Sequence, residues 1–222
     1  MGVMIREWMV DMGGVLTLHQ DKEMEREILS FLGDSHPSFD AIAPVLSGSL
    51  LDRMSCREID EATYWKEFSR ISGIPIPDLK GRSLWGMFFH PVIDQAVRGL
   101  IIRAKARGVR VVLASNTEPA HLKIHTERGD YRIFDTRYTS CRLRLVKPDL
   151  RFFQEILRRE GSRPEETLFT DDSQRNCDAA ARLGILTWRY TDPPALEALL
   201  IKLGVLENEP VTEHTTLYNE KS

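Results

Sequence analysis

Several side chains that could do chemistry stand where short apolar stretches of the sequence end. The set holds three carboxylates, a hydroxyl, an amide and a lysine: Asp11, Ser115, Asn116, Lys147, Asp171 and Asp172. Carboxylates that are crowded together repel one another unless they share a cation, and ligands that are all oxygen favour Mg²⁺. If the fold brings these groups together, they predict a magnesium site beside a nucleophile.

Phosphoryl transfer is the reaction that suits such a set. Asp11 would attack phosphorus and form an aspartyl phosphate, which water would then hydrolyse. Mg²⁺ and Lys147 would neutralise the phosphate oxygens, while Ser115 and nearby backbone amides would hold the phosphate. Each piece alone is more typical of a turn or a helix cap. The prediction therefore depends on all of them meeting at one place.

An alternation of strands and helices would bring these residues together. Strands are predicted over 8–10, 109–114, 167–170 and 185–190, and the first three end at the polar residues. Helices between the strands imply parallel pairing and a doubly wound α/β sheet. In such a sheet ligands bind outside the carboxyl ends of the strands. The polar residues are therefore expected along one edge of the sheet.

A helical block interrupts this alternation after the first strand. Helices are predicted over 23–32, 55–72 and 79–87. Ser55 with Glu58 three residues later has the form of a capping box, which predicts the start of the second of these helices. An all-helical block inserted into an α/β sheet is typical of a lid or cap over the site.

The predicted organisation is a core of two segments with a small cap inserted between them. We expect an α/β core over 1–18 and 91–206 and an all-helical cap over 19–90. The segment 207–222 is polar and aperiodic, which predicts a flexible tail.

Composition excludes several classes of function. Lys and Arg number 30 against 33 Asp and Glu, a net charge of −3, and the basic residues are scattered, which argues against nucleic-acid binding. No apolar run reaches the roughly 18 residues of a membrane span. The three cysteines form no close pair, which suits a reducing compartment. We expect a cytoplasmic protein with a small-molecule partner and no nucleic acid or membrane; the oligomeric state is left open.

Four segments resemble the motifs of the haloacid dehalogenase superfamily. They are WMVDMGGVL at 8–16, VLASNT at 112–117, VKPD at 146–149 and LFTDDSQRN at 168–176. The resemblance covers about residues 5–190 and extends to the order and spacing of the motifs. The helical block after the first motif has the placement of the family's small cap. The best fit is the branch that resembles glucose-1-phosphatase and the phosphatase domain of epoxide hydrolases.

The resemblance implies a Rossmann-like core, an aspartyl intermediate and Mg²⁺ as cofactor. The metal would be bound by Asp11, the backbone carbonyl of Gly13 and Asp172. Asp171 would be a neighbouring support residue. The expected site residues are Asp11 and Lys147 for catalysis, Ser115, Asn116, Gly13 and Gly14 for phosphate binding, and Asp171 and Asn176 as supports.

One position departs from the pattern of the family. Its phosphatases usually carry a second aspartate two residues after the nucleophile, which protonates the leaving oxygen, but here that position is Gly13. General acid catalysis contributes roughly 10²–10⁴-fold to a rate. The protein could therefore favour easier leaving groups, such as those of sugar 1-phosphates or acyl phosphates. Another residue could instead supply the proton, and His19, Asp21 and His90 are the candidates.

The third outcome is that turnover has been lost. The chain would then be a non-catalytic descendant that binds a phosphometabolite or a protein partner. We favour a Mg²⁺-dependent phosphatase that acts on a small phosphorylated metabolite, with a sugar phosphate as one option. Dehalogenation ranks well below, because the pair Asp171-Asp172 would be odd in a metal-free site.

Two other groups of residues are expected to be structural. His121 and His125 are four residues apart, but no Glu lies between them as in H-E-x-x-H and no third ligand is evident. A solvated or half-buried helix face is therefore expected for both. Aromatic residues at helical spacing are more often core than substrate contacts, and this is expected of Trp65, Trp85, Phe88 and Phe89.

Overall fold

One parallel sheet forms the centre of the protein. In the computed structural model, which describes residues 4–18, 21–33 and 38–208, five strands are ordered β3-β2-β1-β4-β5. They are β1 (Glu7–Val10), β2 (Arg110–Ser115), β3 (Thr136–Thr139), β4 (Thr167–Asp171) and β5 (Leu186–Arg189). Val10 pairs with Leu113 on one side and Thr170 on the other, so β1, β2 and β4 end at the same edge. The predicted doubly wound parallel sheet is confirmed.

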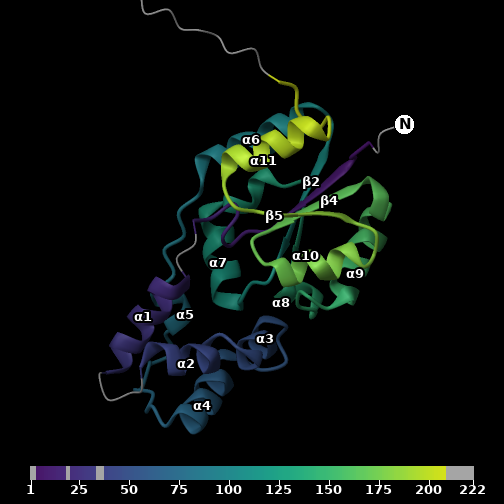
Figure 1. Cartoon of the computed structure of the whole chain (residues 1–222). Helices are drawn as coiled ribbons and strands as arrows, with labels where there is room; N and C mark the ends of the chain where they lie inside the picture. The colour runs from purple at the N-terminus through teal and green to yellow at the C-terminus, as the bar shows by residue number, and fades with distance from the viewer. Residues whose placement is uncertain (1–3, 19–20, 34–37, 209–222) are drawn as a thin grey trace, which may run out of the picture.

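Helices cover both faces of this sheet. α6 (Gln95–Ala106) and α11 (Pro193–Lys202) lie on one face, and α9 (Leu150–Glu160) and α10 (Gln174–Ala181) lie on the other (Figure 1). Two further helices, α7 (Pro119–Arg128) and the short α8 (Ser140–Leu143), follow β2 and β3. Apolar side chains are buried on both sides of the strands, with Trp8 and Leu113 in one cluster and Met9 and Phe169 in the other.

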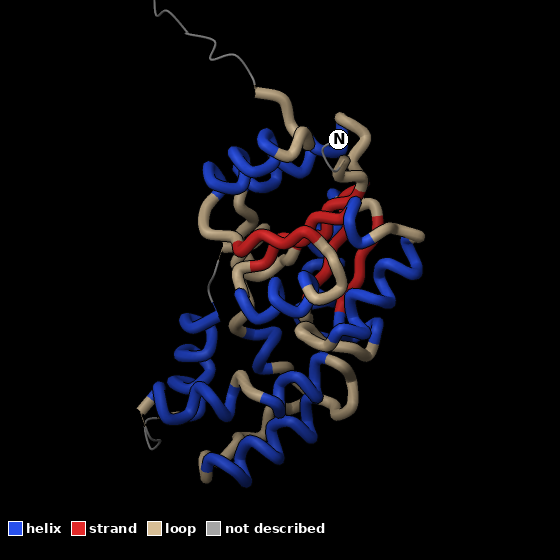
Figure 2. Tube along the Cα trace, turned by 45° about the vertical axis from the view of Figure 1, so that its right-hand side comes forward, coloured by secondary structure: helices blue, strands red, loops and turns tan. Residues whose placement is uncertain are grey.

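Between β1 and α6, the described residues form five further helices that make a group of their own. They are α1 (Asp21–Leu32), α2 (Phe39–Leu46), α3 (Ser49–Ser55), α4 (Glu61–Ser72) and α5 (Leu84–Met87). These helices, here called the cap, lie together beyond one end of the sheet (Figures 1 and 2). They bury a separate apolar cluster that includes Ile28, Leu46, Tyr64 and Phe68. The exact boundaries at 19–90 stay a prediction.

The predicted helix over 55–72 is wrong at its start. Ser55 ends α3 instead of capping a helix, and the backbone at Arg57 has a positive φ of 59°, which breaks the helix. α4 begins later, where the Asp60 carboxylate accepts a hydrogen bond from the Thr63 amide at 2.8 Å. The helix predicted over 79–87 is shorter too, because it forms only from Leu84, after the cap at Ser83.

Some predictions about the rest of the chain are not tested by this fold. Among the described residues, no helix combines the length and the apolar character that crossing a membrane needs. The predicted cytoplasmic location stays a prediction. The predicted tail over 207–222 lies almost wholly outside the described residues.

Candidate active site

Asp11 is the first residue after the central strand, and its side chain is almost fully buried. Its backbone amide continues the sheet by donating to the Thr170 carbonyl at 3.0 Å, which fixes where the strand ends. Its carboxylate accepts a hydrogen bond from the Met12 amide at 2.7 Å. Only 7% of the residue is exposed. The carboxylate is therefore held by the backbone that follows β1.

Lys147 joins two of the predicted carboxylates. Its Nζ lies 2.9 Å from Asp11 Oδ1 and 2.6 Å from Asp171 Oδ2, and the lysine is 3% exposed. Burial alone would lower the pKa of Lys147, but the charges of Asp11 and Asp171 outweigh it and raise that pKa. The lysine therefore stays an ammonium ion between two carboxylates.

Asn116 holds the backbone of Lys147 in place. The Lys147 amide donates to Asn116 Oδ1 at 2.8 Å, and Asn116 Nδ2 donates to the Lys147 carbonyl at 3.0 Å. Both ends of the Asn116 side chain are thus engaged with the residue that carries the ammonium group. Asn116 therefore positions Lys147, and its predicted contact with phosphate stays a prediction.

Asp171 and Asp172 complete the carboxylate cluster at the end of β4. Asp171 is fully buried and accepts hydrogen bonds from the Ser173 amide at 2.8 Å and from Asn176 Nδ2 at 3.0 Å. One oxygen from each of Asp11, Asp171 and Asp172 lies within 4.8 Å of the other two. The carboxyl ends of neighbouring strands have therefore brought together residues that are some 160 positions apart in sequence. Trp8 and Thr170, which are 162 positions apart and joined by a hydrogen bond, show the same long-range pairing within the sheet.

The charge balance of this cluster is unfavourable without a cation. Three carboxylates face one ammonium group, and burial raises the pKa of Asp11 to about 7, with Lys147 opposing the rise and Asp171 and Asp172 adding to it. A divalent cation would relieve this repulsion, and an all-oxygen donor set suits Mg²⁺. The residues present therefore fit the predicted cofactor.

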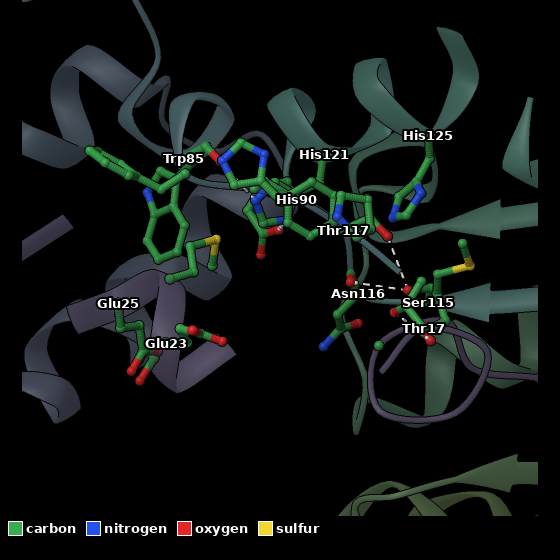
Figure 3. Close-up of a pocket in the computed structure, with 18 of the residues that line it drawn as sticks. Thr17, Glu23, Glu25, Trp85, His90, Ser115, Asn116, Thr117, His121 and His125 are labelled. Carbon is green, nitrogen blue, oxygen red and sulfur yellow. Dashed lines mark hydrogen bonds and ion pairs between the residues drawn. The ribbon is translucent and has the colours of Figure 1, made fainter. Parts of the chain in front are cut away.

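A cavity of about 680 Å³ lies next to the cluster, because Gly13, two residues after Asp11, is among the residues that line it. Ser115 and Asn116 line the same cavity (Figure 3). Ser115 is buried at the end of β2, where its hydroxyl accepts from Thr117 Oγ1 at 3.0 Å. Gly14 has a φ of 71°, in the left-handed region that favours glycine. A Cβ added at Gly13 would meet no atom within 4 Å, so this position has room for a side chain.

The three alternative proton donors are placed differently. His90 is exposed and lines the cavity (Figure 3). His19 lies outside the described residues, and of Asp21 only the backbone, in α1, is described. His90 is therefore the one of the three whose side chain the structure relates to the cavity.

A contact between core and cap that the sequence did not predict lies across the cavity. Glu118, just before α7, accepts a hydrogen bond from the Ser55 hydroxyl at 3.0 Å and pairs with His121 Nδ1 at 2.7 Å. His121 Nε2 lies 3.1 Å from the Trp85 carbonyl, and the Phe89 ring stacks on His121 at 3.6 Å between centroids. Burial opposes the ionised form of Glu118, but His121 outweighs it and lowers the pKa of Glu118.

The predicted environment of the two α7 histidines is wrong. His121 and His125 are both buried, with exposures of 7% and 2%, and each pairs with a carboxylate. The partner of His125 is Asp130 at 2.8 Å. The histidines are buried because of tertiary packing: the start of α7 packs against the cap, where Ala120 lies at the edge of the cap's apolar cluster. The spacing of the two histidines alone could not reveal this.

The fold and this cluster define the class of the protein. A family model described as haloacid dehalogenase-like hydrolase matches residues 9–184. The chain belongs to this family, so the predicted superfamily and the predicted enzyme class, a hydrolase, are confirmed. The finer assignment to the glucose-1-phosphatase and epoxide hydrolase branch stays a prediction.

Several known proteins are similar to this chain. A sesquiterpene phosphatase from Aspergillus oryzae is 28% identical over 100 residues, which are 45% of this chain and 51%, about half, of that protein. A HAD family enzyme from Bacteroides thetaiotaomicron is 26% identical with a TM-score of 0.67, over 85% of this chain and 94% of that one. A structure of that enzyme with magnesium and inorganic phosphate matches with a TM-score of 0.60 and 26% identity, over 84% and 94%.

Proposed function

We propose that this protein is a Mg²⁺-dependent phosphatase that hydrolyses a small phosphate monoester through an aspartyl phosphate on Asp11. The observation that carries the proposal is the buried pair of Asp11 and Lys147, 2.9 Å apart, within a cluster of three carboxylates at the edge of a cavity. The similarity to a sesquiterpene phosphatase and to an enzyme solved with magnesium and phosphate supports it.

The metal would be held by Asp11, Asp172 and the carbonyl of Gly13. When bound, Mg²⁺ supplies positive charge that offsets the charge developing on the phosphate oxygens. Asp171 is left to hold the Lys147 ammonium group at 2.6 Å, and it is itself oriented by the Ser173 amide and Asn176. This division gives each of the three carboxylates a separate task.

The chain's own groups account for the two chemical steps. An oxygen of Asp11 forms a bond to phosphorus while the ester P–O bond breaks and the alcohol leaves with its oxygen. Lys147, kept in place by Asn116, offsets negative charge on the phosphoryl group, and Ser115 with the amides after Asp11 orients it. Water then attacks the acyl phosphate, which releases phosphate and restores the Asp11 carboxylate.

An aryl phosphate tests this proposal directly, because its leaving group barely needs an acid. With p-nitrophenyl phosphate and Mg²⁺ we expect turnover that Asp11→Asn reduces at least about 10³-fold, as loss of a catalytic nucleophile does. A chelator should abolish the wild-type activity. Equal rates for wild type and Asp11→Asn would instead support the non-catalytic, phosphometabolite-binding descendant, as would a lack of any turnover.

The proton for an alkoxide leaving group is proposed to come from His90, which lines the cavity.

Because Gly13 has free space around its missing Cβ, Gly13→Asp can supply an acid at the position the family normally uses. We expect this variant to hydrolyse alkyl phosphates roughly 10- to 100-fold faster, within the range of general acid catalysis, and to leave aryl phosphates nearly unchanged. Measuring kcat on both substrates checks it, and a gain on the aryl ester alone would contradict it.

A further inference from the structure

Many of the residues that line the cavity away from the carboxylate cluster are apolar. Its volume of about 680 Å³ lies within the usual range of ligand pockets, about 300–1,000 Å³. The apolar lining residues come from the cap and from the two connections that lead to it: Met12, Leu18, Met24, Leu51, Trp85, Phe88, Phe89, Pro91 and Val92. Burying a hydrocarbon group against such walls is favourable in proportion to the area removed from water.

Two of these residues expose apolar surface at the cavity. Leu18 and Val92 are 49% and 46% exposed, and the Leu18 amide donates to the Val92 carbonyl at 2.9 Å. The two chain connections between core and cap thus run side by side and present apolar side chains there. A hydrocarbon group in the cavity would remove part of this surface from water.

Several of the hydroxyl and amide groups that line the cavity already form hydrogen bonds within the protein. The hydroxyl of Thr17 donates to the Met12 carbonyl at 3.0 Å, and that of Ser47 donates to the Ala43 carbonyl at 2.8 Å. Thr117 is engaged with Ser115, and Asn116 with Lys147. A substrate hydroxyl would therefore have mainly the lining carboxylates and His90 to bond to, and a hydroxyl that lies against the apolar side chains would lose its hydrogen bonds to water, which costs free energy.

The charged groups around the cavity are acidic. In the described part of the chain, the residues that line it include Glu23, Glu25, Glu27 and Glu118 and neither Lys nor Arg. Among its histidines, His121 and His125 are already paired with carboxylates. A negatively charged group on the organic part of a substrate would therefore lie among like charges.

We infer that the substrate is the phosphate monoester of a neutral, largely apolar alcohol, and that the cavity rejects esters whose organic part carries a negative charge. This inference rests on the proposed phosphatase function and narrows its substrate class. The apolar walls supply affinity for the leaving group, and Glu23 and its neighbours on α1 supply the discrimination.

Four primary esters with similar leaving groups test it: octyl phosphate, propyl phosphate, glycerol 3-phosphate and the phosphate of 3-hydroxypropanoate. Each fully buried methylene contributes about fourfold, so we expect kcat/KM for the octyl ester to exceed that for the propyl ester at least about 30-fold. Glycerol 3-phosphate should fall below propyl phosphate, and the carboxylate ester at least about tenfold below it. Equal or higher values for either polar ester would overturn the inference.

Two pairs of variants locate the effect in the cavity. Leu51→Ala should lower the preference for octyl over propyl phosphate about fivefold, whereas Ile71→Ala, at an exposed cap residue outside the cavity, should not change it. Glu23→Lys should raise kcat/KM for the carboxylate ester about five- to tenfold. Glu127→Lys makes the same charge change outside the cavity lining and should have no such effect. If the controls change selectivity as much as the cavity variants, the cavity is not its source.

Failure of this inference can be told apart from failure of the proposed function. Turnover of p-nitrophenyl phosphate that needs Asp11, without preference for the octyl ester, would overturn the substrate class and leave the function standing. If no variant turns over any ester, the Kd values of octyl phosphonate and 3-phosphonopropanoate still test the cavity by calorimetry. We expect octyl phosphonate to bind at least about tenfold more tightly, and the reverse order would overturn the inference.

Discussion

Strand β1 has a buried carboxylate at each end, and the two lie in different surroundings. Glu7 begins the strand and is 2% exposed, while Asp11 follows it and is 7% exposed. Burial is the largest cause of a raised pKa in both, to about 7 in each case. Glu7 has a hydrogen bond from the Ser162 hydroxyl at 2.6 Å, and among the described residues its Oε1 has no partner. Asp11 has Lys147 at 2.9 Å.

The difference shows what marks a reactive carboxylate in this fold. A raised pKa reports burial and does not by itself identify a site. At the Asp11 end, the ammonium group of Lys147 and two more carboxylates lie close to Asp11, next to a cavity. At the Glu7 end the nearby cation is Arg110, which is half exposed and pairs with Glu160. The following predictions test whether these partners separate the two ends.

The largest expected difference between the two ends of β1 is the loss of stability when the cation at each end is removed. Lys147→Met leaves Asp11 and Asp171 buried without their counter-ion, which should lower the free energy of unfolding by about 3–5 kcal/mol. Arg110→Met removes a half-exposed cation from Glu160, whose side chain is 4% exposed but keeps a hydrogen bond from the Tyr138 hydroxyl, and should cost less, about 1–2 kcal/mol. Urea unfolding at neutral pH, without added Mg²⁺, measures both.

The activity of the same two variants sharpens the contrast. Lys147→Met should reduce kcat on p-nitrophenyl phosphate about 10²–10³-fold, because a positive charge near the phosphoryl group is lost. Arg110→Met should retain activity within about twofold, since Arg110 pairs with Glu7 in the sheet, at the opposite end of β1 from Asp11. Similar losses in both variants would mean that Lys147 acts through the fold alone.

The sequence predicted the Asp11 end well because strand ends converge by topology. Once β1, β2 and β4 are parallel neighbours, Asp11, Ser115 and Asp171 must meet at one edge. Lys147 was included in the predicted set because it lies between the second and third predicted strands, immediately before a predicted helix. The burial of Glu7 was not predicted, because a single Glu beside Arg6 at the start of a strand has no sequence pattern that distinguishes a buried residue from an exposed one.

The cap was predicted less accurately, and the reason is physical. α2 and α3 are short and were not predicted, and Ser55 caps no helix because its hydroxyl donates to Glu118. The edge strand β3 was also missed, since four residues carry too little periodicity. Contacts such as Glu118 with Ser55, 63 positions apart, arise only when the cap packs on the core.

The stabilisation that Mg²⁺ gives to the folded state should depend on the Asp11 end of β1 and not on the Glu7 end. Ligand binding to the folded state stabilises it by about 2.7 kcal/mol at a concentration 100 times the Kd. We expect Mg²⁺ to raise the Tm of the wild type and of Glu7→Gln equally, and to have little effect on Asp172→Asn. A thermal scan with Mg²⁺ and with a chelator measures this. A full shift in Asp172→Asn would exclude Asp172 as a ligand.

The smallest expected effect is the pH dependence that Glu7 gives to stability. Its pKa is raised from 4.5 to about 7 in the folded protein, mainly by burial, so the folded state holds this proton more tightly than the unfolded state does. That contribution is complete below pH 4.5 and is lost as the pH rises through 7. Glu7→Gln stays neutral, so it should exceed the wild type in free energy of unfolding by about 1–3 kcal/mol at pH 8 and show no gain at pH 4. Urea unfolding at both pH values, with Mg²⁺ present to hold the Asp11 end constant, isolates the Glu7 end, and a gain that is the same at pH 4 would show that ionisation of Glu7 is not its cause.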